Sequence, residues 1–211
     1  MSAPTITLSQ LQRQTIIGTA TGPDGNTYRL STHAVGPARD QPVSGDNTIS
    51  RATYYGTKSG WYLNMPSSGE RVVADASIRA GRVVLTSLIP DLSSPCSFGG
   101  TGWVMEFDTI TGDRLDTTTF DTNADGNVNS TDYLAFPSSG TGTNNTSGRM
   151  IGAIPAAPAF MGMPPPGAGG GANGGVQTEV KQINLSNGTL TTVVETGPPR
   201  STGRVMWREV R

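Results

Sequence analysis

Glycine and proline interrupt this chain so often that a long helix cannot form. The 211 residues include 28 glycines and 15 prolines, about a fifth of the chain, against roughly 12% in average proteins. Both residues destabilise the interior of a helix. Charged residues make up only 15% of the chain, too few for the solvated faces of a helical bundle or coiled coil. The sequence therefore predicts an all-β fold whose short strands are separated by turns.

Charge and hydropathy exclude two classes of partner. The formal net charge is −1 and the pI is about 5.8, so the clustered basic charge that binds nucleic acid is missing. No apolar run approaches the ~20 residues that cross a bilayer, so we expect no transmembrane segment. The sequence starts without a basic segment followed by an apolar one, which indicates that it carries no secretory signal. The single cysteine, Cys96, is expected to be buried or paired outside this chain.

Residues typical of strands recur through the first half of the chain. Thr7 and Gln10 predict a capping box that opens a helix over residues 7–16. Branched and aromatic residues then predict an antiparallel meander. In the last of its strands, Trp103, Met105 and Phe107 alternate with more polar positions, which predicts one buried and one wetter face. The expected strands are Tyr28–Thr32, Ile49–Tyr55, Gly60–Met65, Glu70–Asp75, Arg82–Ile89 and Trp103–Asp108.

Two segments share a pattern typical of hairpins. Residues 107–115 and 183–190 each carry an apolar residue, then Asp108 or Asn184, three residues, and Gly112 or Gly188. Asp or Asn ends a strand by bonding to its own turn, and glycine supplies a positive φ. The two copies are further apart than one propeller blade of about 40–45 residues, a spacing that inserted segments would explain. They indicate either repeated blades or two unrelated hairpins.

Two stretches have the composition of flexible, low-complexity loops. Residues 137–148 are rich in Ser, Gly, Thr and Asn, and residues 161–175 consist mainly of Gly, Pro, Ala and Met. Such segments bury too little apolar area to offset the entropy lost on ordering. We therefore expect both to be surface loops.

Residues 121–132 carry the sharpest chemical motif in the sequence. They match the twelve-residue EF-hand-type calcium loop, in which alternate oxygen-bearing side chains and one backbone carbonyl surround the ion. A glycine at the sixth position, here Gly126, allows the sharp turn, and Val128 is expected to anchor the loop on the core. The predicted ligands of Ca²⁺ are Asp121, Asn123, Asp125, Asn127 through its carbonyl, Asn129 and Asp132.

The flanks of this loop argue against a complete EF-hand. Residues 116–120 before it are β-prone, and only residues 130–136 after it could form a helical turn. We therefore expect a calcium loop inserted between strands. A surface turn that matches the motif by chance is the alternative, and bound calcium could be either structural or regulatory.

Five segments together resemble a known protein family. They are residues 60–73, 81–90, 95–103, the calcium loop and the closing Gly203–Arg208. The combination is similar to the C-terminal β-propeller of the PilY/PilC family, tip-associated adhesins and assembly factors of type IV pili in Gram-negative bacteria. The resemblance runs from about Ile49 to Arg211. Family members are similar in carrying a single calcium loop, with Asp at its ninth position. Here that position is Asn129, so either Asn129 or Asp132 closes the calcium shell.

The resemblance implies a fold, a location and a set of partners. Residues 1–211 would be the C-terminal part of a propeller built of antiparallel four-stranded blades, that is, a partial propeller with its other blades outside this chain. The protein would lie outside the cell, at the pilus tip or outer-membrane surface. Its partners would be minor pilins of the tip, a host or abiotic surface, and the rest of the propeller. Calcium would act in pilus assembly, retraction and twitching motility.

Other functions are weighed against this one. A quinoprotein-like propeller dehydrogenase shares such hairpins but should repeat tryptophan-docking blades. A dockerin-like calcium-dependent binding module has a similar loop, but it carries two loops with helices. His33 is the sole histidine, so a Cys/His or Ser/His catalytic arrangement would rest on that one residue. We therefore expect no enzymatic activity.

Overall fold

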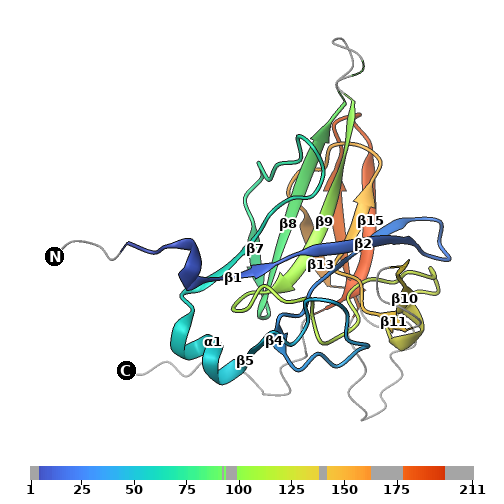
Figure 1. The fold of residues 1–211 in the computed structure, drawn as a ribbon. Coiled ribbons are helices and arrows are strands. Elements are labelled where there is room, and N and C mark those ends of the chain that lie inside the picture. The colour runs from blue at the N-terminus through green and yellow to red at the C-terminus, as the bar shows by residue number, and fades with distance from the viewer. Residues whose placement is uncertain (1–4, 92, 94–98, 138–141, 163–177, 198–211) are drawn as a thin grey trace, which may run out of the picture.

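The computed structural model places most of the chain in antiparallel sheets that pack in layers. It describes residues 5–91, 93, 99–137, 142–162 and 178–197. The central layer is a six-stranded sheet in the order β2-β3-β12-β9-β8-β7; its strands β8 and β9 stand upright in Figure 1, and β2 runs across the view. Its strands are β2 (Ile16–Thr21), β3 (Thr27–Ser31), β7 (Ser77–Arg79), β8 (Arg82–Pro90), β9 (Gly100–Asp108) and β12 (Gly148–Ile151).

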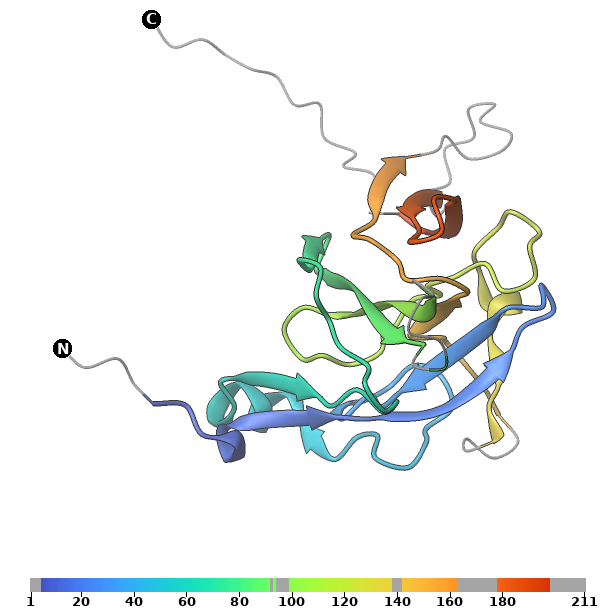
Figure 2. The same ribbon diagram turned by 90° about the horizontal axis from the view of Figure 1, so that it is seen from above.

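A three-stranded sheet covers one face of the central sheet. Its order is β13-β14-β15 and its pairs are antiparallel. Figure 2 shows this sheet on one side of β8 and β9 and the N-terminal strands on the other. Phe120, Ile183 and Val193 join Val84 and Val104 in the larger core between these two sheets. The strands are β13 (Ala159–Gly162), β14 (Thr178–Asn184) and β15 (Leu190–Thr196).

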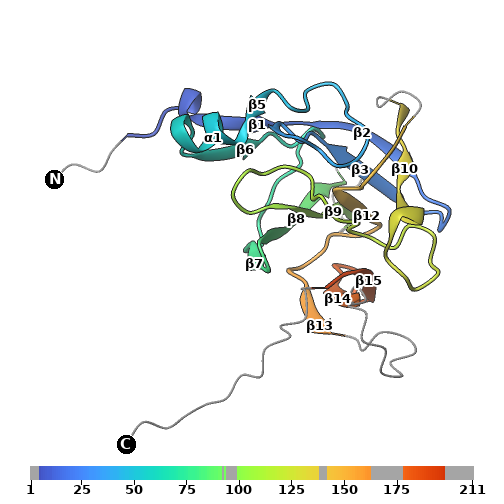
Figure 3. The same ribbon diagram turned by 90° about the horizontal axis from the view of Figure 1, so that it is seen from below.

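Short elements cover the opposite face. The parallel pair β1 and β6 brings Trp61 and Leu63 onto Leu85, Trp103 and Phe107, which form a second apolar core. Figure 3 shows these elements together on the side away from β13–β15. They are η1 (Leu8–Gln10), β1 (Leu11–Gln14), β4 (Val35–Gly36), β5 (Ile49–Ser50), α1 (Arg51–Thr57) and β6 (Gly60–Leu63); η2 (Ser130–Asp132), β10 (Leu134–Ala135) and β11 (Thr143–Asn144) complete the described elements.

The all-β prediction is confirmed, but the four-stranded blades are not seen. Among the described residues the sheets have two, three or six strands. The meander over β7, β8 and β9 is antiparallel as expected. Beyond β9, however, the next partner in the sheet is β12, not the following segment of chain. Long-range pairing therefore replaces the repeated local unit that a blade would require.

Four local predictions differ from the structure. The capping box of Thr7 and Gln10 forms, but it opens a single 3-10 turn, not a helix, because the chain then pairs with β6. The strand expected over Ile49–Tyr55 is limited to β5 at its start. Residues 51–57 form the helix α1 instead, which Ser50 caps by accepting from the Thr53 amide. Residues 70–75 contribute one bridge, between Arg71 and Leu88, instead of a strand.

The expected wetter face of β9 is the fourth difference. Val104 and Glu106 are as buried as Trp103, Met105 and Phe107 on the opposite face. The reason is that both faces of the sheet are covered. A fully buried strand does not show the alternation expected of a half-exposed one.

The two expected loops differ in outcome. Residues 142–148 are described, and 143–144 form β11 while Gly148 begins β12. Residues 144–147 are buried, and the Asn145 side chain bonds to the backbone of Leu115, Thr117 and Thr119. This part of the expected surface loop therefore belongs to the packed interior. Residues 138–141 and 163–177 lie outside the described residues, as do Cys96 and Trp207.

Both predicted glycine turns form, but only one joins two strands, and in that turn Asn187, not Asn184, accepts from the turn backbone, at the Thr189 amide. Gly188 turns between β14 and β15 with a φ of 80°. After β9, the Asp108 carboxylate accepts from the amides of Ile110 and Thr111, and Gly112 has a φ of 71°. The chain then leaves the sheet, because Asp113 is drawn into bonds with Gln14 and Val35.

These two turns give a matched test. A Cβ on Gly112 would overlap the Trp61 indole, whose Nε1 donates to the Thr109 carbonyl at 3.1 Å, whereas a Cβ on Gly188 meets open space. Each Gly→Ala substitution destabilises the fold by about 1 kcal/mol, because alanine disfavours the left-handed backbone. Overlap adds about 1–3 kcal/mol. We therefore expect Gly112→Ala to lower the urea midpoint clearly more than Gly188→Ala. Equal midpoints would contradict this packing.

Candidate calcium loop

The predicted calcium loop lies between the core and the β10–β11 hairpin. Phe120, immediately before it, is fully buried and bridges to Glu195 of β15. Val128 is buried, as its position in the motif predicted. The loop ends in η2, whose N-cap is Asn129 and whose last residue is Asp132. Both ends are thus held against the core, while Ala124, Asp125 and Asn127 between them are exposed.

Oxygen-bearing side chains fix the backbone of this loop. The Asp121 Oδ2 accepts from the Gly126 amide at 2.9 Å, which spans the first half of the loop. Asn123 accepts from the Asp125 amide and Asp125 from the Asn127 amide, at 2.9 and 2.7 Å. Gly126 has a φ of 80°, a conformation that favours glycine. The alternate-residue pattern read from the sequence is therefore a real structural periodicity.

Asp132 closes the loop from inside. Its two carboxylate oxygens accept from the amides of Thr122 and Asn129, at 2.8 and 2.9 Å, and the residue is buried. Burial raises the pKa of Asp132 above its ordinary value; these backbone hydrogen bonds oppose the rise, and the charges of Asp121 and Asp125 add to it. Burial and the nearby carboxylates thus disfavour the ionised form of Asp132, which a bound cation would stabilise.

Asp121 offers the clearest free ligand atom. Its Oδ1 is buried and has no hydrogen-bond partner, whereas its Oδ2 is bound to Gly126. Buried carboxylate oxygens are nearly always paired with a donor or a cation. The residues of the loop therefore fit a hard cation bound by Asp121, Asn123, Asp125, the Asn127 carbonyl and either Asn129 or Asp132. Among the described residues, no three His, Cys, Asp or Glu side chains are grouped closely enough for a metal site by themselves, so amide and backbone oxygens would have to complete the shell.

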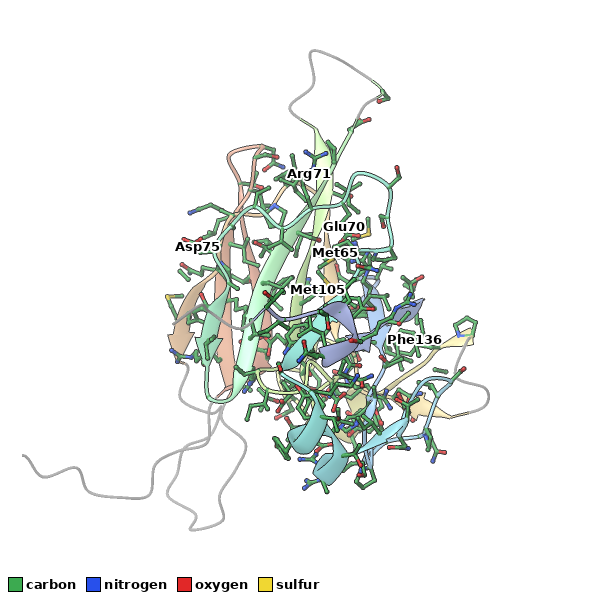
Figure 4. The ribbon with its side chains drawn as sticks, turned by 60° about the vertical axis from the view of Figure 1, so that its left-hand side comes forward. Met65, Glu70, Arg71, Asp75, Met105 and Phe136 are labelled. Carbon is green, nitrogen blue, oxygen red and sulfur yellow. The ribbon has the colours of Figure 1, made fainter. Side chains whose placement is uncertain are left out.

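His33 and Trp103, which lie outside the loop, have structural partners. His33 is buried, with Nε2 3.2 Å from Asp116 and Nδ1 3.6 Å from Asp113. Trp103 is buried beneath Arg29, whose guanidinium lies 3.9 Å from the ring centroid. That guanidinium also binds Glu70 and contacts the Met105 sulfur, and Figure 4 shows Glu70 beside Met65 and Met105.

Sequence patterns missed the buried Arg29–Glu70 pair and two larger buried ionic clusters. Arg114 binds Asp40 and Asp46, and Lys181 contacts Glu106 and Glu195. These partners are distant in sequence, except that Lys181 and Glu195 lie on paired strands. For the second cluster, the only signal in the sequence was a charged residue, Lys181, inside a strand-forming segment.

Comparison with known proteins identifies relatives. No protein-family model matches the chain. A type IV pilus biogenesis factor PilY1 homologue of Xylella fastidiosa (strain Temecula1) is 29% identical over 172 residues, covering 77% of this chain and 12% of that protein. Another PilY1 homologue of the same strain is 33% identical over 82 residues, covering 36% of this chain and 6% of that protein.

A solved structure agrees with these relatives. The crystal structure of the Pseudomonas aeruginosa PilY1 C-terminal domain superposes with a TM-score of 0.60 over 94% of this chain, at 19% identity. The chain is similar to PilY1 homologues in sequence and to the PilY1 C-terminal domain in fold. It spans about an eighth of the first PilY1 homologue and 34% of the solved PilY1 chain. The resemblance read from the sequence is thereby confirmed.

Among the described residues, no helix is both long and apolar enough to cross a membrane. The longest, α1, has seven residues.

Proposed function

We propose that this chain is the C-terminal β domain of a type IV pilus biogenesis factor that acts outside the cell. The proposal rests on the similarity to PilY1 homologues, which are type IV pilus biogenesis factors, and on the fold shared with the PilY1 C-terminal domain over 94% of the chain. The domain binds minor pilins at the pilus tip and a host or abiotic surface, and it does not act as a catalyst. Parts of the protein outside this chain complete a propeller with its sheets.

Calcium is the second part of the proposal. Residues 121–132 bind one Ca²⁺, supported by the partnerless buried Oδ1 of Asp121. The ion orders the loop and so couples it to Phe120, which contacts the core and pairs with β15. Metal occupancy then biases the tip protein between supporting pilus extension and permitting retraction.

A genetic complementation experiment tests this function. Deleting the reading frame in its own bacterium is expected to reduce surface pili and twitching motility. The wild-type gene restores both, and so does Asp91→Ala, which alters an exposed turn aspartate that accepts from Ser93. Asp125→Ala is expected to restore the protein level but not normal motility.

Two outcomes separate the parts of the proposal. A deletion strain with normal pili and motility contradicts the biogenesis function. Full rescue of motility by Asp125→Ala contradicts only the role of calcium.

A further inference from the structure

A lysine is enclosed by acidic groups between the two main sheets. Lys181 of β14 is fully buried, and its Nζ contacts Glu106 Oε1 of β9 and Glu195 Oε2 of β15. Glu106 is likewise fully buried and belongs to the central sheet, whereas Lys181 and Glu195 belong to the three-stranded sheet. An amine and a carboxyl group from different sheets are therefore in direct contact.

The surroundings of this pair are apolar on one side and basic on the other. The rings of Phe120 and Phe160 each have their centroid 5.7 Å from Nζ. Arg82 donates from Nη1 to Glu106 Oε2 at 3.0 Å, which leaves Oε1 facing the lysine. A small cavity lined by Arg82, Glu106, Phe160 and Glu195 adjoins the group. The carboxyl carbon of Glu106 is thus polarised by Arg82 and open to Nζ on its other side.

Burial brings both reacting groups toward their neutral forms. Loss of hydration lowers the pKa of Lys181 well below its ordinary value, and the positive charges of Arg82 and Arg79 lower it further. Loss of hydration also raises the pKa of Glu106 to about 7, although Arg82 opposes the rise. A proton can therefore pass from Nζ to the Glu106 carboxylate, leaving an amine beside a carboxylic acid. An amine is a nucleophile and an ammonium is not.

We propose that Lys181 and Glu106 condense into an amide bond that links β14 covalently to β9. The Nζ lone pair attacks Cδ of the protonated Glu106, and a C–N bond forms. The Cδ–Oε1 bond then breaks, and Oε1 leaves as water into the adjoining cavity. One amine and one carboxylic acid give one amide and one water, so no oxidant, reductant or cofactor is needed.

Glu195 and Arg82 assist this reaction from fixed positions. The Glu195 carboxylate, in contact with Nζ, accepts the proton that the attacking nitrogen loses and returns it to the departing hydroxyl. Arg82 stabilises the negative charge that develops on Oε2 and afterwards donates to the amide oxygen. Contact between the two groups raises their effective concentration far above that of free groups in water, which favours the condensation.

Mass spectrometry of the full chain under denaturing conditions tests the proposal. The wild-type chain is expected to be lighter than its sequence by the mass of one water. Lys181→Arg keeps the charge and cannot form the bond, so it should show its full sequence mass. Trypsin should release from the wild type a branched peptide that joins residues of β9 to residues of β14. Glu195→Gln, nearly equal in size, should leave a larger fraction of the chain unlinked.

Three results would overturn the proposal. The first is a folded wild-type chain with its full sequence mass, since that leaves the group an ordinary buried ion pair. The second is a branched peptide mapped to Glu195, because the link would then stay within one sheet. The third is an equal linked fraction in Glu195→Gln, which would remove the assigned proton transfer. Circular dichroism of each variant establishes that the chain is folded.

Discussion

Replacing Arg114 by Met is expected to lower the free energy of unfolding by about 3–5 kcal/mol, since it removes one partner from a buried ionic cluster. The Arg114 side chain is fully buried. It donates to Asp40 at 2.8 Å, to Asp46 at 2.9 and 2.7 Å, and to the Ser31 carbonyl at 3.1 Å. Without it, two carboxylates remain buried with no cation.

The protonation of this cluster supports the size of the effect. Burial alone would lower the pKa of Arg114, but hydrogen bonds to Asp40 and Asp46, together with their negative charges, raise it overall. Both carboxylates also hold the surrounding loops, since Asp46 accepts from the amides of His33 and Val43 and Asp40 from that of Asn145. Loss of the guanidinium thus loosens three segments at once.

Denaturant unfolding followed by tryptophan fluorescence measures this loss. Arg39→Met is the matched control, because that side chain is 74% exposed and lies 3.8 Å from Asp116; its effect should stay below about 1 kcal/mol. Arg114→Lys keeps the charge but not the two-sided fork, so an intermediate loss is expected. If Arg114→Met and Arg39→Met unfold at the same urea concentration, the cluster does not stabilise the fold as described.

Local features of the fold were predictable from sequence, and pairings were not. The turns at Gly112 and Gly188 and the strands over residues 82–89 and 103–108 depend on neighbouring residues, so short patterns reveal them. The position of β12 beside β9 depends on a contact between distant segments. The burial of Glu106 depends on the second sheet, which supplies Lys181 as its partner. Such partners leave no periodic signal in either strand.

The candidate site shows the same division. The residue types and spacing of positions 121–132 predicted a loop with alternate side chains fixing its backbone, and the structure has it. The burial of Asp132, whose two oxygens accept from backbone amides, could be seen only in the structure. The absence of a hydrogen-bond partner for Asp121 Oδ1 was likewise visible only in the structure. Which residue completes the calcium shell stays a proposal.

Substitution at Asp121 is expected to have the largest effect on calcium affinity. Removing a residue that only orients a metal ligand typically weakens binding by 10–100-fold, so removing a ligand itself, in Asp121→Ala, should weaken it by at least about 100-fold. In the wild type, calcium at 100 times its Kd should raise the free energy of unfolding by about 2.7 kcal/mol. Asp121→Ala should lose that stabilisation, and Asp91→Ala should retain it, because Asp91 is exposed and lies outside the loop.

Calcium titration of the full chain by calorimetry tests the central claim most directly. We expect one binding event in the wild type, the same event in Asp91→Ala, and none at equal protein concentration in Asp121→Ala. Circular dichroism should show all three chains folded. A folded wild-type chain that gives no calcium-dependent heat, or an Asp121→Ala chain that binds as tightly as the wild type, would contradict calcium binding at residues 121–132.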